Sequence, residues 1–83
     1  MDLPRILERN VREARQRLGL SQEQLALDTE MKRSYLSDLE RGTRNPSAKA
    51  IARLAVSLGV EPWTLLVEPG DDGPANSPTP RAR

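Results

Sequence analysis

Cysteine and histidine are both absent from the 83-residue sequence. Their absence excludes disulfide bonds, thiolate or imidazole ligands for a metal, and most nucleophile–base pairs of enzymes. Long apolar runs are also missing, since none approaches the roughly 20 residues of a membrane-spanning helix. The first segment, MDLPRILERN, is charged and periodic rather than an apolar signal core. We therefore expect a cytoplasmic protein that is not an enzyme, holds no metal or cofactor and has no membrane partner.

A chain of 83 residues can bury one small core, which predicts a single domain without a separate ligand-binding module. No small-molecule effector is therefore expected. Nothing in the chain alternates as a strand does, and no internal repeat is visible. Apolar residues instead recur at three- and four-residue steps, so the predicted fold class is all-α, a compact bundle of five helices.

Each predicted helix has start or stop signals. The first carries the apolar residues Leu3, Ile6, Leu7, Val11, Ala14 and Leu18, with Asp2 as a candidate cap. Ser21 and Gln24 form a capping box that starts the second, which ends near residue 28 or 29. The remaining signals are Gly42 at the end of the third helix, Ser47 and Gly59 at the two ends of the fourth, and Glu61-Pro62 at the start of the fifth.

The domain is predicted to occupy residues 3–67. Residues 68–83, EPGDDGPANSPTPRAR, contain four prolines and almost no apolar side chain. Such a segment cannot offset the entropy lost on ordering, which predicts a disordered, proline-rich tail.

Basic charge gathers in the middle of the chain, although the net charge is only +1. Residues 32–53 hold six basic and two acidic side chains, but a basic segment is often only a solvated surface. The short link of about three residues between the second and third helices is typical of a helix-turn-helix, whose second helix enters the DNA major groove. A helix at residues 32–41 would leave these side chains outside the core: Lys32, Arg33, Ser34, Ser37, Asp38 and Arg41.

The residue types of this helix suit base edges. Arg33 can donate two hydrogen bonds to guanine, the two serines allow close approach, and Asp38 can accept a hydrogen bond from a cytosine amino group. The alternative is a solvated face, on which Asp38 only pairs with Lys32 or Arg41.

The chain resembles the phage Cro/repressor-type (xenobiotic-response-element-like) helix-turn-helix family over nearly all of residues 3–67. The resemblance implies a lambda-repressor-like domain of five helices that binds double-stranded DNA as a homodimer. Such a protein regulates transcription from a pseudo-palindromic operator. The markers in this chain are Gly19-Leu20-Ser21-Gln22, Leu25-Ala26, Leu36, Leu39-Glu40-Arg41-Gly42, Asn45-Pro46-Ser47, Leu54-Ala55 and Leu58-Gly59-Val60.

The resemblance also implies roles for single residues. Arg15 and Glu40 form a structural ion pair between the first helix and the end of the third. Tyr35 either reaches a phosphate with its hydroxyl or packs in the core. The side chains implied to face the bases are Lys32, Arg33, Ser34, Ser37 and Asp38. Those implied to contact phosphates are Gln22, Tyr35, Arg41, Thr43, Arg44 and Asn45, while a stripe of Arg5, Arg9 and Arg12 faces either DNA or water.

The chain departs from the family pattern at two positions. Glu30 stands in the turn where the family usually has glycine, so a residue with a Cβ is expected in a left-handed conformation, at a cost of roughly 1 kcal/mol. Trp63 stands where the family is usually polar. Trp63 and Leu66 are therefore expected at the dimer interface, and the alternative is that Trp63 folds over Ile51 or Leu54.

In its stand-alone size, the chain resembles phage Cro-like regulators. In the run RSYLSDLERGTRNPS, it resembles more closely the controller proteins of restriction-modification systems. The alternative function is an antitoxin-like or other protein-binding module on the same fold, with the tail as its binding segment.

Overall fold

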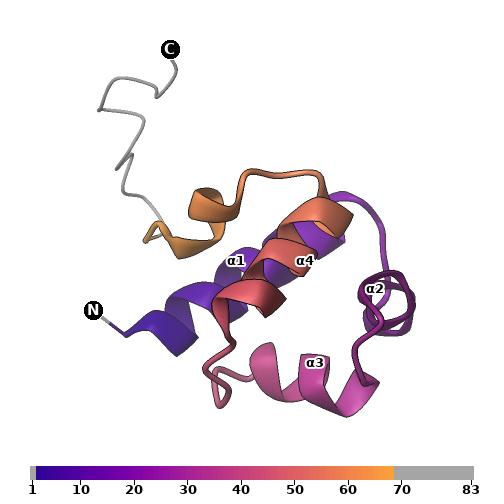
Figure 1. Ribbon diagram of the computed structural model, residues 1–83, viewed down its shortest axis with the longest axis horizontal. Helices are drawn as coiled ribbons and strands as arrows, with labels where there is room; N and C mark the ends of the chain where they lie inside the picture. Colours follow the sequence, from indigo (N-terminus) through magenta and orange to yellow (C-terminus); the bar gives the residue numbers. More distant parts are fainter. Residues whose placement is uncertain (1, 69–83) are drawn as a thin grey trace.

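The computed structural model describes residues 2–68, and every element of secondary structure in that range is helical. The all-α prediction is therefore confirmed for this part of the chain. None of these helices is long and apolar enough to cross a membrane. The elements are α1 (Leu3–Arg17), α2 (Gln22–Thr29), α3 (Arg33–Leu39), α4 (Ala48–Leu58) and the 3₁₀ helix η1 (Pro62–Leu66) (Figure 1).

Of the five predicted helices, four are α-helices in the described residues, and the fifth segment, residues 62–66, is a 3₁₀ helix. Pro62 supplies no N–H at the start of this segment, and Val67 already has an extended backbone with φ −90° and ψ 133°. Only a short helical piece fits between these residues. The tighter 3₁₀ form is common in such short pieces.

Side-chain caps fix where α2 and α4 begin. Ser21 Oγ accepts a hydrogen bond from the Gln24 N–H at 3.0 Å, and Gln24 Oε1 accepts one from the Ser21 N–H at 2.8 Å. This is the predicted capping box. Ser47 Oγ accepts a hydrogen bond from the Ala50 N–H at 3.1 Å. The helices that flank α3 in the chain therefore start at residues set by the sequence.

A single aliphatic core joins the five helical elements. In Figure 1, α1 and α4 lie side by side, and α3 crosses below them. Leu18, which the periodicity assigns to the core, is exposed, because α1 ends at Arg17 and Leu18 is its C-cap. Truncating a deeply buried leucine to alanine costs about 2–5 kcal/mol. The most deeply buried side chains are Leu7, Val11, Leu25, Leu36, Leu39, Leu54 and Leu65.

Asn10 fastens η1 to α1. Its side-chain Nδ2 donates to the backbone oxygens of Leu65 at 2.9 Å and Val67 at 2.8 Å, with a longer contact of 3.4 Å to Thr64 O. The chain is thereby held to the domain as far as residue 67. Residues 69–83 lie outside the described residues, so the domain limits and the disordered tail stay predictions.

The turn between α2 and α3 consists of three residues, and Glu30 is the first of them. Its φ of 61° and ψ of 33° are left-handed, as expected from its place in the motif. Among residues 2–68, Glu30 is the only non-glycine residue with a positive φ. The conformation persists because Met31 N–H donates to Ala26 O at 3.0 Å and closes the end of α2.

We expect Glu30→Gly to raise the free energy of unfolding by about 1 kcal/mol, because glycine has no Cβ to strain a left-handed backbone. Urea denaturation followed by circular dichroism measures the change. Asp28→Gly is the matched control, because it also removes a carboxylate, but from a helical position two residues before Glu30. It should lower the free energy of unfolding, and equal effects of the two substitutions would contradict the assignment of strain.

Candidate nucleic-acid interface

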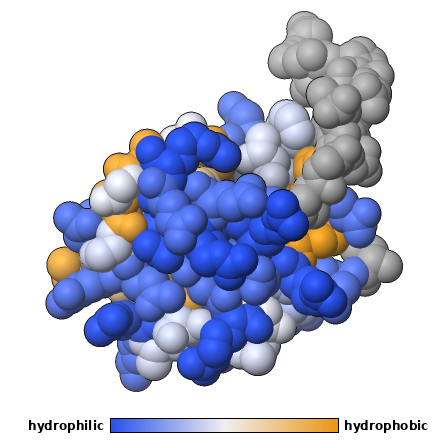
Figure 2. Space-filling model, turned by 180° about the vertical axis from the view of Figure 1, so that it is seen from behind, coloured by the Kyte–Doolittle hydropathy of each residue, from blue (hydrophilic) through white to orange (hydrophobic). Residues whose placement is uncertain are grey.

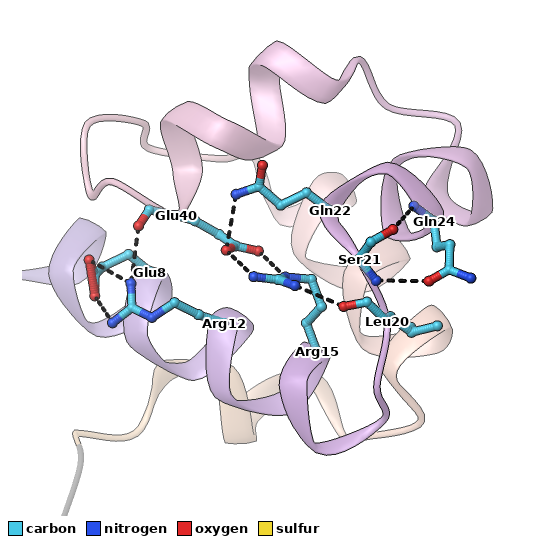
Figure 3. A network of polar contacts seen from close by, with 8 residues as sticks. All are labelled: Glu8, Arg12, Arg15, Leu20, Ser21, Gln22, Gln24 and Glu40. Carbon is cyan, nitrogen blue, oxygen red and sulfur yellow. Dashed lines mark hydrogen bonds and ion pairs between the residues drawn. The ribbon is translucent and has the colours of Figure 1, made fainter.

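An ion pair between α1 and the end of α3 fixes the position of α3. Arg15 Nε lies 2.7 Å from Glu40 Oε2, and Arg15 Nη2 lies 2.9 Å from Glu40 Oε1 (Figure 3). Only 4% of the Glu40 side chain and 13% of the Arg15 side chain are exposed. The structure therefore brings these two residues together in a buried, bidentate ion pair. This is the strongest geometry for a guanidinium and a carboxylate.

Further hydrogen bonds surround this pair. Arg15 Nη1 donates to Leu20 O at 2.8 Å, and Gln22 Nε2 donates to Glu40 Oε1 at 3.2 Å. Bonding to the Glu40 carboxylate, with its negative charge, raises the pKa of the Arg15 guanidinium above its ordinary value, although burial acts in the opposite direction. Gln22, implied by the resemblance to contact a phosphate, is half-buried and turns its amide nitrogen inward. One carboxylate thus joins α1, the start of α2 and the end of α3.

The arginine stripe of α1 lies beside carboxylates of the same helix. Arg9 Nε is 3.0 Å from Glu13 Oε2, and Arg12 Nη2 is 3.1 Å from Glu8 Oε1. Arg12 Nη1 also donates to the backbone oxygen of Glu40 at 3.3 Å. Two of the three cations of the stripe are therefore partly neutralised by neighbouring glutamates, which weakens their attraction for an anionic ligand.

The start of α3 is exposed while its other face is buried. α3 spans Arg33–Leu39 rather than residues 32–41, because Lys32 and Glu40 have the geometry of its two caps. Leu36 and Leu39 are fully buried and anchor the helix in the core. This anchoring turns the remaining positions outward: Lys32, Arg33 and Ser34 are exposed, and Ser37 and Asp38 are partly exposed.

Asp38 organises the loop that follows α3. Its carboxylate forms ion pairs with Arg41 and, at 3.4 Å, with Arg44. Its backbone oxygen accepts hydrogen bonds from the Thr43 N–H at 3.1 Å and the Thr43 hydroxyl at 3.0 Å. Asp38 therefore pairs with Arg41, one of the two partners that the sequence suggested, and with Arg44 rather than Lys32. Asn45, at the end of this loop, is exposed.

Tyr35 has one face against the core and one beside a cation. Its side chain is half-buried and packs against the core cluster. The Arg44 guanidinium carbon lies 4.6 Å from the centre of the Tyr35 ring, within cation–π range. The core contact and the exposed edge occur together, so the two interpretations of Tyr35 are compatible.

Two cations of α4 join this surface although no sequence motif marks them. Lys49 and Arg53 line a shallow hollow that also includes Lys32 and Arg44. The sequence places Lys49 and Arg53 in the basic segment, one helical turn apart. It contains no signal that the start of α4 lies beside the start of α3, which is a consequence of tertiary packing.

The two residues expected at a dimer interface differ in exposure. Trp63 is 40% exposed, whereas Leu66 is half-buried and packs against the core.

The face seen in Figure 2 is mostly hydrophilic, with apolar side chains in small separate patches. Among residues 2–68, no three metal-ligating side chains come together.

Known proteins share this arrangement. A family model described as Helix-turn-helix matches residues 11–62, which is more than half of the chain. The chain therefore belongs to the helix-turn-helix family of transcriptional regulators. It is not an enzyme.

Controller proteins are among the relatives. Control protein C.BamHI of Bacillus amyloliquefaciens is 48% identical over 48 residues, which cover 58% of this chain and 59% of that protein. Control protein C.SmaI of Serratia marcescens is 39% identical over 70 residues, or 84% of this chain and 83% of that protein. The crystal structure of the restriction-modification controller protein C.AhdI from Aeromonas hydrophila matches with a TM-score of 0.72 and 42% identity. That match covers 75% of this chain and 94% of the C.AhdI chain.

We expect Glu40→Gln to lower the free energy of unfolding by about 3–5 kcal/mol, because it leaves the Arg15 charge buried without a counter-charge. Chemical denaturation measures the loss. The double variant Arg15→Met/Glu40→Leu should lose less, since neither charge remains. Glu13→Gln removes an exposed carboxylate and is the control, with an expected change below about 1 kcal/mol. A loss from Glu40→Gln no larger than this control would contradict a buried pair.

Proposed function

We propose that the protein is a sequence-specific regulator of transcription that binds double-stranded DNA as a homodimer. α3 of each protomer lies in the major groove of one half of a pseudo-palindromic operator. The observation that carries the proposal is the exposed start of α3. Lys32, Arg33 and Ser34 project there, while Leu36 and Leu39 hold the helix from behind. Family membership supports the same surface.

Within this complex, the start of α3 reads the bases. Arg33 donates two hydrogen bonds to a guanine, and Asp38 accepts one from a cytosine amino group. As Asp38 forms this contact, Arg41 and Arg44 give up their ion pairs with its carboxylate. The released cations then reach phosphates. The base-reading set is Lys32, Arg33, Ser34, Ser37 and Asp38, and the phosphate-contacting set is Gln22, Tyr35, Arg41, Thr43, Arg44 and Asn45.

The two protomers meet at the end of the described domain. In η1, Trp63 is a large apolar side chain that remains partly exposed, and Leu66 follows it three residues later. Tryptophan is common among the residues that carry interface energy. A twofold axis at this end would place the recognition helices about 34 Å apart, one turn of DNA.

A role in controlling restriction-modification genes fits the relatives C.BamHI, C.SmaI and C.AhdI. Because dimerisation and DNA binding are coupled, operator occupancy would rise steeply with protein concentration. Such a dependence suits genes whose products must accumulate in a defined order.

Selection of binding sites from random double-stranded DNA tests the proposal. We expect an inverted repeat whose half-sites are one helical turn apart, with an affinity that falls steeply as salt increases. Weak binding without any enriched motif would overturn the proposed function.

Two substitutions test the residue roles on the selected site. Arg33→Ala should cost about 1–3 kcal/mol and relax the preference at one base pair, because it removes base contacts. Arg44→Ala is the matched cation outside α3, and it should weaken all DNA sequences about equally. Affinities for the selected site and for base-substituted sites measure both effects. Equal, sequence-independent losses from the two variants would contradict base reading by Arg33.

The dimer interface has its own test. We expect Trp63→Ser to weaken dimerisation at least tenfold, or about 1.4 kcal/mol, since a buried interface tryptophan typically contributes more. Sedimentation equilibrium over a range of concentrations measures the dissociation constant. Leu27→Ala is the control, because Leu27 is an exposed apolar residue of α2 outside the proposed interface. An unchanged dissociation constant for Trp63→Ser would exclude this interface.

A further inference from the structure

We propose that Lys49 and Arg53 form a second phosphate-binding element, which holds the DNA backbone beside the groove that α3 occupies. The inference rests on the proposed function and extends it from α3 and its loop to α4. Its ligand is the phosphodiester backbone of duplex DNA.

The first support is the composition of the hollow between the starts of α3 and α4. Lys32, Arg44, Lys49 and Arg53 line this hollow, and no carboxylate is among its lining residues. Clustered cations of this kind create a positive potential that attracts a polyanion. The exposed start of α3 shares the hollow through Lys32 and Ser34, so the hollow continues the proposed DNA surface.

The second support is that three of these four cations lack a close counter-charge, since within residues 2–68 only Arg44 pairs with a carboxylate, that of Asp38. In the described part of the chain, no carboxylate oxygen lies within 4.0 Å of the side-chain nitrogens of Lys32, Lys49 or Arg53. On their other side, Lys49 and Arg53 line a groove with Asp28 and Glu30, but no ion pair forms across it. On α1, by contrast, Arg9 and Arg12 are paired with glutamates of the same helix. Charge on α4 is thus available to an external anion.

The third support is spacing. Lys49 and Arg53 are four residues apart on α4, so they share one face and lie about 6 Å apart along the helix axis. Consecutive nucleotides of one DNA strand rise about 3.4 Å each, so two cations this far apart can each reach a separate phosphate of one strand. Ser47 also lines the hollow. Its Oγ accepts the capping hydrogen bond, which leaves its own O–H free to donate to a phosphate.

The test compares the wild type with Lys49→Gln/Arg53→Gln on the selected operator. Each phosphate contact contributes about 0.9 to the slope of log affinity against log salt, so the double variant should lower the slope by roughly two per protomer. Ethylation interference should also lose one or two adjacent phosphates in each half-site, with the preferred bases unchanged. Arg5→Gln/Arg9→Gln removes two exposed cations of α1 and should change neither result.

The outcomes separate the two proposals. If the wild type binds no duplex DNA, the proposed function fails. If it binds its operator and the double variant shows the same slope and the same interference pattern, the inference about α4 is wrong and the proposed function stands. A third outcome is that millimolar inorganic phosphate raises the melting temperature of the wild type but not of the double variant, while the interference pattern is the same for both. This result would assign the hollow to a free anion and would also overturn the inference.

Discussion

A buried carboxylate must find enough hydrogen bonds and positive charge to replace the water that it loses, and this constraint on Glu40 shapes the whole domain. Arg15 supplies a guanidinium from α1, and Gln22 supplies an amide from the start of α2. Three helices can satisfy one side chain only if their relative positions are fixed. The orientation of α3, and with it the direction of every exposed side chain on that helix, therefore depends on a largely buried contact.

The distribution of charge follows from the same arrangement. The net charge is only +1, but two surfaces differ in how their cations are paired with carboxylates. On α1, Arg9 and Arg12 pair with glutamates of the same helix, so the fields of these two cations are partly cancelled. At the starts of α3 and α4, cations meet in a hollow without carboxylates. A polyanion would therefore approach one side of the domain preferentially, before any base is recognised.

Asp38 is at the centre of the polar contacts that follow α3. Its carboxylate holds Arg41 and Arg44, and Arg44 in turn lies over the ring of Tyr35. In the proposed complex these contacts compete with those to DNA. Binding that releases the arginines only when Asp38 gains a base partner would discriminate against wrong sequences, because a carboxylate left unpaired beside the DNA phosphates is unfavourable.

The sequence by itself determined the helical class, the caps at Ser21 and Ser47 and the left-handed turn at Glu30, because these features depend on contacts within a few residues. It also indicated the helix-turn-helix and the outward start of its second helix, since apolar spacing decides which face is buried. Only the tertiary structure decided the inward turn of Gln22 and the meeting of Lys49 and Arg53 with Lys32. The physical reason is range: these features join side chains far apart in the chain, and no local pattern records which of them will become neighbours.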